Sequence, residues 1–214
     1  MKKTILIAPF DGPLAAALAA EASSDGWSVA LALVRGLAAP ADAAPGFLTL
    51  AYDPRSYVSA STLALSAQNA LGELDAAVLV FDPAAAKAEF LSSKPGELAG
   101  LVEERCSGPL FLAREIIRRF EARKSGSILL FAPESPRDAA LGPTAAMADG
   151  AFEGLGTGLF AAAAGASWAA YGLRDASGQA DRAARFALEL LGEAKPAKAG
   201  RWLRYSGKGG IFGQ

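Results

Sequence analysis

The chain has 214 residues, of which 52% are hydrophobic and 20% are charged, and this is enough to bury the core of one globular α/β domain. Its net charge of −1 offers no basic face to nucleic acid or to an anionic membrane. It contains one cysteine, Cys106, and no histidine. An internal disulfide is therefore excluded, and the commonest metal ligand and the commonest general base are both missing. We expect no metal site.

Apolar segments of strand length alternate with segments of helical length along the chain. In order, the pattern predicts strand Lys3–Ala8, helix Leu14–Ser24, strand Trp27–Val34, loop Gly36–Gly46, strand Phe47–Tyr52, helix Ser59–Gly72, strand Ala76–Phe81, helix Gly96–Lys124 broken near Ser107-Gly108-Pro109, strand Ser127–Ala132, helix Thr144–Ala164, strand Ser167–Tyr171, helix Ala180–Leu191 and strand Arg201–Tyr205. This order predicts an α/β fold: a three-layer, Rossmann-like, doubly wound parallel sheet of about seven strands. We expect a single domain over residues 1–214.

Two stretches imitate membrane or export signals. Two lysines precede the first apolar run, but Pro9, Asp11 and Pro13 interrupt that run too early for a signal peptide. Residues Gly154–Leu173 carry no charge over roughly 20 residues, the length of a membrane span, yet they are mostly alanine and glycine. We interpret them as a buried helix and a strand, and we expect a cytoplasmic protein that contacts neither membrane nor nucleic acid.

Four short segments carry a resemblance to a known family. They are Leu14–Gly26, Gly108–Arg114, Lys124–Leu130 and Gly150–Leu155, in that order and at those spacings. Together they resemble the first helix, the Gly-x-Phe-x-x-x-Arg stretch, the entry to the fifth strand and the Lys-Ala-Ala-x-x-Gly-Leu stretch of the short-chain dehydrogenases/reductases (SDRs). The resemblance covers nearly the whole chain and implies a dinucleotide-binding fold.

The phosphate-binding loop of that family departs from its pattern here. The family has Thr-Gly-x-x-x-Gly-x-Gly, and the matching positions run from Ala8 to Ala15 without any of the required glycines. Pro13 removes an N–H donor, and Asp11 places a carboxylate where phosphates would lie. We therefore expect no cofactor, with NAD or NADP as the minority alternative. The vestigial cleft would be formed by Phe10, Asp11, Gly12, Asp82 and Glu134.

The catalytic positions of the family are also replaced. Phe81-Asp82-Pro83-Ala84 stands in place of Asn-Asn-Ala-Gly, Arg105 in place of the helix asparagine, and Pro133 with Glu134 and Ser135 in place of the serine. The Tyr-x-x-x-Lys pair, in which the ammonium lowers the phenol pKa, is matched by Ala146 and Gly150. No tyrosine or lysine occurs between Lys124 and Tyr171. We expect no catalytic residues of the family's type.

Other candidate residues have two interpretations each. Asp11, Asp82 and Glu134 could hold a cation, but capping and solvated carboxylates are the more ordinary interpretation. Tyr171 is either a displaced catalytic tyrosine or a packed strand residue, and Cys106 is either a nucleophile or a small buried apolar residue. The family's substrate loop after the sixth strand is missing, because Gly172–Gly178 leads directly into the last helix.

The helix Ala145–Ala164 is rich in small residues, and its glycines cost helix stability, about 1 kcal/mol each relative to alanine. This cost indicates a face that another element approaches closely. In the SDR family this helix and the preceding long one pair between subunits. We therefore predict a homo-oligomer, or a hetero-oligomer with an active SDR paralogue, formed through the helices around residues 98–120 and 145–164.

These observations favour a non-catalytic SDR-fold protein that acts through oligomerisation, for example as the inactive subunit of a dehydrogenase/reductase complex. Two alternatives remain open. One is an oxidoreductase-like enzyme with an atypical site that binds NAD(P) or another nucleotide. The other is a small-ligand sensor that reuses the cleft without turnover. Whether the protein is an enzyme stays open, and we favour the interpretation that it is not.

Overall fold

The computed structural model describes residues 2–35, 47–85, 89–134, 141–192 and 198–207. The predicted loop 36–46 and residue Ser135 lie outside these ranges. The described strands are β1 (Thr4–Ala8), β2 (Ser28–Val34), β3 (Leu48–Tyr52), β4 (Ala76–Val80), β5 (Ser127–Pro133), β6 (Ala169–Asp175) and β7 (Trp202–Tyr205). The helices are α1 (Gly12–Ser24), α2 (Tyr57–Leu71), α3 (Pro95–Val102), α4 (Gly108–Arg123), α5 (Pro143–Ala163) and α6 (Ala180–Gly192), with a short 3₁₀ turn η1 (Pro83–Ala85) and a π-helical segment η2 (Glu103–Ser107).

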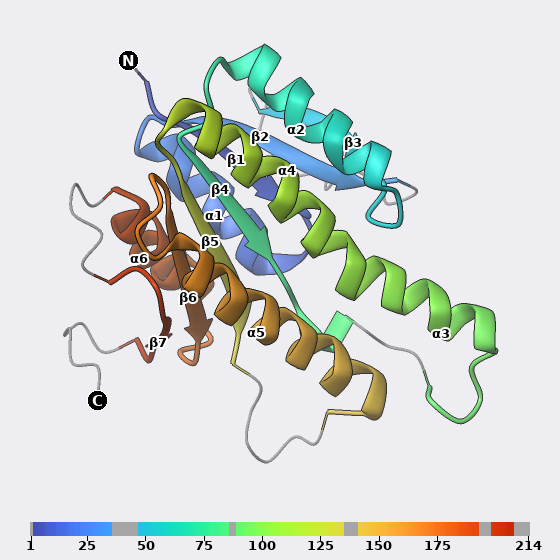
Figure 1. Cartoon of the computed structure of the whole chain (residues 1–214). Coiled ribbons are helices and arrows are strands. Elements are labelled where there is room, and N and C mark those ends of the chain that lie inside the picture. Colours follow the sequence, from blue (N-terminus) through green and yellow to red (C-terminus); the bar gives the residue numbers. More distant parts are fainter. Residues whose placement is uncertain (1, 36–46, 86–88, 135–140, 193–197, 208–214) are drawn as a thin grey trace.

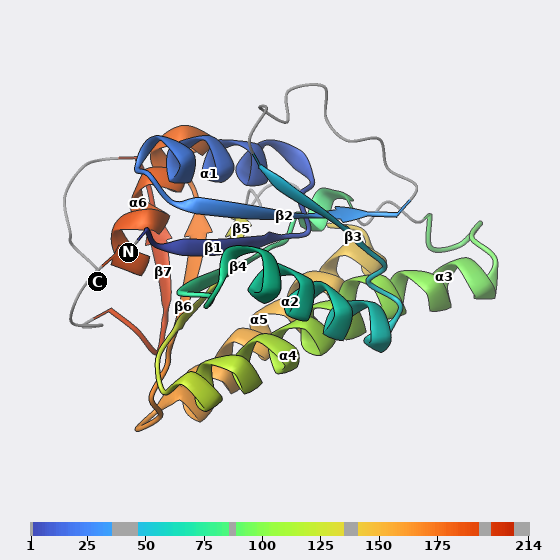
Figure 2. The ribbon, with the colours of Figure 1, turned by 90° about the horizontal axis from the view of Figure 1, so that it is seen from above.

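The described strands form one parallel sheet in the order β3-β2-β1-β4-β5-β6-β7. Helices α2, α4 and α5 cover one face of this sheet, and α1 and α6 cover the other (Figures 1 and 2). The predicted three-layer, doubly wound architecture of seven strands is therefore confirmed. Strand β6 is longer than predicted and continues to Asp175, because residues 172–175 pair with β5 and β7.

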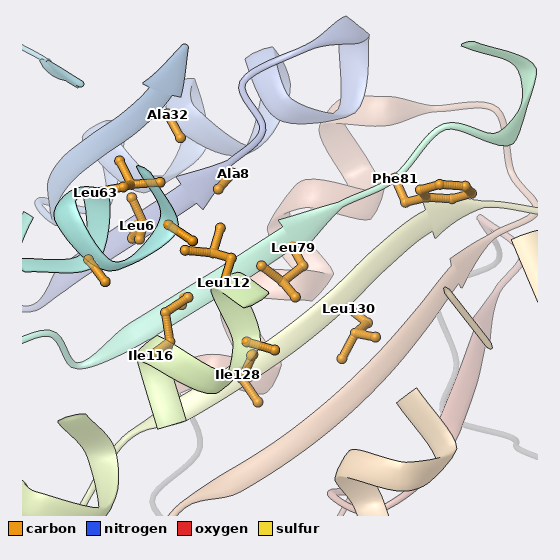
Figure 3. Close-up of a cluster of buried hydrophobic side chains, with 14 of the residues drawn as sticks. Leu6, Ala8, Ala32, Leu63, Leu79, Phe81, Leu112, Ile116, Ile128 and Leu130 are labelled. Atoms are coloured by element: carbon orange, nitrogen blue, oxygen red, sulfur yellow. The ribbon is translucent and has the colours of Figure 1, made fainter. Parts of the chain in front are cut away.

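The core lies on both sides of the sheet because the central strands are apolar at every position. Strands β1 and β4 are completely buried. Figure 3 shows Leu112 and Ile116 of α4 directed onto sheet residues that include Leu79 and Ile128. Within the described residues, no helix has the length and apolar character that a membrane span requires.

The long predicted helix is not broken at Ser107-Gly108-Pro109. It runs through α3, η2 and α4, and η2 takes the wider π-helical turn. The physical reason is Pro109, which has no N–H to donate to the carbonyl four residues earlier. The phenol of Tyr52 then donates to the carbonyl oxygen of Gly108, at 3.2 Å.

Candidate functional site

The carboxyl ends of β1 and β4 mark the point where the strand order reverses direction. From β1 the chain turns to β2 and β3, and it later returns to β4 on the other side of β1. Open parallel sheets bind ligands at such a switch point. Two adjoining hollows lie here, and both are lined by Asp11 and Val80.

The first, called the narrow hollow, has a volume of about 40 Å³. Its wall is formed by apolar residues at the ends of β1 to β4 and on α4 and α5, including Val34, Phe81 and Phe152. Phe81 and Phe152 stack, with ring centroids 4.7 Å apart. Glu104 and Arg105 of η2 also line this hollow, and they form an ion pair at 3.2 Å. Arg105, which matches the family's asparagine, is therefore next to the cleft but already paired.

The second, called the wide hollow, has a volume of about 370 Å³, which is in the range of small-molecule sites. Four carboxylates line it, from Asp11, Asp82, Glu134 and Asp175, and none of the described lining residues is a lysine or an arginine. The first turns of α1 and α6 reach the same hollow through Gly12 and Ala180. The N-terminal, positive ends of the α1 and α6 dipoles therefore lie at the same hollow as the four carboxylates, and this arrangement is electrostatically favourable.

Two of these carboxylates are held by other groups. Glu134 accepts from Nε of Arg204 at 2.5 Å. The buried Asp175 accepts from the backbone N–H and the hydroxyl of Ser177, at 2.8 and 2.6 Å. This turn connects β6 to α6 within a few residues, as expected from the missing substrate loop. The polar groups at this end of β5 and β6 are thus engaged in holding the sheet edge together.

The structure brings together four of the five residues predicted to form the vestigial cleft. Asp11, Gly12, Asp82 and Glu134 all line the wide hollow. Phe10 does not, because its side chain is buried in the core on the α1 and α6 side. Its backbone N–H donates to the carbonyl of Ala32 at 2.7 Å, and this bond fixes its orientation.

Ala146 and Gly150, which the sequence matches to the Tyr-x-x-x-Lys pair, lie on α5 away from the sheet. Both positions are exposed on the outer face of α5. The face of α5 that packs on the sheet carries Ala145, Ala148 and Phe152. The family stretch Lys-Ala-Ala-x-x-Gly-Leu has seven positions, so one that ends at Gly154-Leu155 begins at Asp149. In this second register, one residue earlier than the first, the tyrosine position is Ala145.

Asp149 forms an ion pair that the sequence did not predict. Its Oδ1 lies 2.6 Å from Nη1 of Arg174 on β6, and Glu153 lies 3.5 Å from the same guanidinium. Arg174 also lies over the ring of Trp202, 4.8 Å from the ring centroid. In the register that begins the stretch at Asp149, the lysine position would carry the opposite charge, and this carboxylate is bound to a mostly buried arginine.

The other two candidate residues, Tyr171 and Cys106, lie in surroundings that do not favour chemistry. Tyr171 is 1% exposed and belongs to the core on the α1 and α6 side, so it lines neither hollow. Cys106 of η2 is half-buried, and burial raises the pKa of its thiol. A raised pKa leaves less of the nucleophilic thiolate. The interpretation of Tyr171 as a packed strand residue fits the structure, whereas Cys106 is only half-buried and belongs to neither core cluster. Among the described residues, no group of three or more acidic or cysteine side chains is arranged to hold a metal ion.

Comparison with known proteins gives matches only among solved structures. No family model matches the chain, and no curated protein matches it. An SDR-family oxidoreductase from Brucella ovis, in complex with a partially ordered NAD, superposes with a TM-score of 0.77 and 16% identity, covering 95% of this chain and 99% of that one. This chain has the SDR fold. An SDR from Serratia marcescens BCRC 10948 superposes with a TM-score of 0.75 and 16% identity, covering 95% of this chain and 96% of that one. A putative SDR from Sinorhizobium meliloti 1021 superposes with a TM-score of 0.74 and 18% identity, covering 97% of each chain.

The SDR resemblance proposed from the sequence is thus confirmed at the level of the fold. The expectation that no cofactor binds is contradicted by the same comparison, because the Brucella ovis structure holds NAD in this fold. That expectation depended on the missing glycines of the phosphate-binding loop. Their absence excludes the loop conformation of the family, but it does not exclude that a nucleotide binds in another way. A ligand can still use the open end of the sheet, where the hollows lie.

Proposed function

We propose that this protein binds a nucleotide in the switch-point cleft, does not itself transfer hydride, and works as a subunit of an oligomer. The observation that carries the proposal is the face of α5 that packs on the sheet. This face carries Ala145 where the family has a tyrosine, and Asp149 where it has a lysine. A carboxylate there would raise the pKa of a neighbouring phenol, whereas the family's ammonium lowers it.

Hydride transfer to a carbonyl also needs a proton donor beside the developing alkoxide. The titratable groups among the described lining of the wide hollow are its four carboxylates. Of these, Glu134 is paired with Arg204, and Asp175 is held by Ser177. A bound nicotinamide nucleotide would supply the hydride, but the described residues of the wide hollow offer it no phenol or ammonium. The phenol of Tyr52, which lines the narrow hollow, already donates to the carbonyl oxygen of Gly108. Binding without turnover is therefore the favoured role of the cleft.

Nucleotide binding is supported by the fold, by the NAD complex of the Brucella ovis relative and by the backbone at Gly12. Gly12 has φ +76°, and no atom lies within 4 Å of where a Cβ would be. The N–H groups of Gly12 and Leu14 at the start of α1 could hold a phosphate group. Pro9 and Pro13 remove two donors, and Asp11 repels phosphate. The loop therefore fits a nucleotide held by fewer backbone donors than the family's loop provides.

Assembly is supported by the outer face of α5. Ala146, Gly150, Gly154 and Gly158 are exposed, and no atom lies within 4 Å of a Cβ built on any of these three glycines. A second helix can approach such a surface closely. We propose that this face, with the outer face of α4, contacts another copy or an active SDR paralogue. The proposed location is the cytoplasm, with no nucleic-acid partner.

An atypical enzyme is the second candidate, because Asp11, Asp82 and Glu134 line the same hollow. One set of measurements separates the two. Melting temperatures are recorded with NAD, NADP, their reduced forms and ATP, and the nicotinamide absorbance is followed with a panel of carbonyl compounds. Nucleotide-induced stabilisation without a change in absorbance supports the proposal. Turnover that Glu134→Gln or Asp82→Asn abolishes supports the enzyme. No stabilisation by any nucleotide contradicts both.

A further inference from the structure

The two hollows of the switch-point cleft differ greatly in volume, at about 40 Å³ for the narrow one and about 370 Å³ for the wide one. A dry cavity of roughly 150 Å³ is enough to hold one benzene ring. The wide hollow therefore has room for a base together with its ribose, whereas the narrow hollow is too small for a single ring. A dinucleotide has two bases, and only one of them finds room here.

The narrow hollow is kept small by contacts between the end of β3 and the start of α4. The phenol of the buried Tyr52 donates to the carbonyl oxygen of Gly108. Pro54 also lies directly against Gly108, since a Cβ at that glycine would come within 2.8 Å of the Pro54 carbonyl oxygen. Arg55 then reaches Glu104 of η2, at 3.3 Å. Widening the hollow to the size of a base would separate these contacts.

The rest of the wall of the narrow hollow belongs to the packed core. Phe81 and Phe152 stack on each other, and both are almost completely buried. Leu79 of β4 and Leu112 of α4 also line this hollow and are part of the same buried cluster (Figure 3). Protein cores are packed as densely as organic crystals, so moving these side chains to admit a base would disrupt the core.

Asp11 lies at the junction of the two hollows, because it lines both of them. A dinucleotide that reached from one hollow to the other would carry the two negative charges of its pyrophosphate past this carboxylate. The start of α1 offers few donors to offset that repulsion, because Pro13 has no N–H. A single phosphate held by Gly12 and Leu14 is therefore the better match to this loop.

The charge of the wide hollow distinguishes the two halves of a nicotinamide dinucleotide. The described lining of this hollow has four carboxylates and neither lysine nor arginine. Such a lining attracts a cationic ring more strongly than a neutral one. The pyridinium ring of oxidised nicotinamide carries a positive charge, whereas adenine is neutral at ordinary pH. The wide hollow therefore favours the nicotinamide half.

We propose that the cleft recognises a single mononucleotide, of the nicotinamide type, in the wide hollow, and that the adenosine half of a dinucleotide stays in solvent. This rests on the proposed nucleotide binding and names the part of the nucleotide that is bound. The adenosine half then contributes no buried contacts to the affinity. Nicotinamide mononucleotide therefore binds as tightly as NAD does.

Isothermal titration calorimetry of the full chain with NAD, nicotinamide mononucleotide and AMP tests this proposal. We expect the dissociation constants of NAD and nicotinamide mononucleotide to agree within about threefold, and AMP to bind about tenfold more weakly or less. A second base buried in the narrow hollow would instead make NAD bind about tenfold tighter than the mononucleotide, or more. Such a gain for NAD, or AMP binding as tight as that of nicotinamide mononucleotide, overturns the proposal, while the proposed nucleotide binding stands.

Two matched variants identify the hollow that is used. Val34→Phe places a larger side chain in the narrow hollow and Leu141→Phe places one in the wide hollow, and both residues are half-buried. We expect Val34→Phe to keep the dissociation constant of NAD within about threefold, and Leu141→Phe to raise those of NAD and nicotinamide mononucleotide about tenfold or more. Circular dichroism checks that both variants are folded. Weaker binding of NAD alone in Val34→Phe overturns the proposal, and the absence of binding by all three nucleotides contradicts both this proposal and the proposed function.

Discussion

Replacing Asp149 with alanine tests whether this residue, which we propose for the family's lysine position, has a structural role. Its carboxylate lies 2.6 Å from Arg174, and the two side chains are 20% and 14% exposed. Breaking a fully buried pair costs about 3–5 kcal/mol, and an exposed pair is worth about 0–1 kcal/mol. With these intermediate exposures, Asp149→Ala should lower the free energy of unfolding by about 2 kcal/mol, which corresponds to a melting temperature lower by about 4–8 °C.

The assay is urea unfolding followed by circular dichroism, with Glu153→Ala as the matched control. Glu153 approaches the same guanidinium at 3.5 Å, but its side chain is 60% exposed, so its loss should cost less than about 0.5 kcal/mol. Asp149→Lys, which restores the family's residue, should destabilise more than the alanine variant because it sets two cations together. An unchanged stability of Asp149→Ala would refute the reasoning and leave this carboxylate available for chemistry.

Substitutions at Asp11, Gly108 and Glu115 test other parts of the structure. Asp11→Asn should tighten NAD binding about fivefold in a calorimetric titration, since removing a repulsion of about 1 kcal/mol is expected for charges 4 Å apart in water. Gly108→Ala should lower the free energy of unfolding by about 1–3 kcal/mol, because the new Cβ would lie 2.8 Å from the carbonyl oxygen of Pro54. Gly154→Ala is the control, since its Cβ would meet no atom within 4 Å, and it should raise the free energy of unfolding of the separated subunit by up to about 1 kcal/mol. Burial raises the pKa of Glu115, but hydrogen bonds from Tyr57, Arg118, Arg119 and Ser61 lower it below its ordinary value of 4.5. The ionised carboxylate therefore stabilises the folded protein above pH 4.5, and this stabilisation is lost as the pH falls through the lower pKa of the folded state. The stability that Glu115→Gln loses at pH 7, measured by urea unfolding, should accordingly become smaller in acid.

The fold could be predicted because its signals are local. Apolar runs such as Ala76–Phe81 alternate with helical segments, and parallel connections leave few arrangements. The orientation of single side chains at the site is harder to predict from the sequence. Phe10 follows a strand and precedes a helix, and sequence alone does not tell whether it faces the cleft or the core. The hydrogen bond of its N–H to Ala32 decides this, and that bond joins different strand ends.

The register of α5 shows a different limit. Successive residues of a helix are rotated by about 100°, so an alignment error of one residue moves a side chain from the sheet to solvent. Alanine and glycine occupy both faces of α5, so its sequence carries little amphipathic signal to correct such an error. The ion pairs of Asp149 with Arg174 and of Glu134 with Arg204 join distant parts of the chain. No local sequence pattern predicts such contacts. The aspartate at position 149, in a helix otherwise rich in alanine and glycine, is the sequence feature that could have indicated an ion pair there.

The proposed cleft binds a nucleotide without transferring hydride. Its most direct test uses the reduced cofactor. NADH and NADPH are titrated into the protein until its fluorescence shows saturation, carbonyl compounds are added, and the nicotinamide absorbance is followed for hours. We predict saturable binding and no oxidation above the protein-free rate. Oxidation that is proportional to protein concentration and lost in Asp82→Asn or Glu134→Gln would contradict the proposed function.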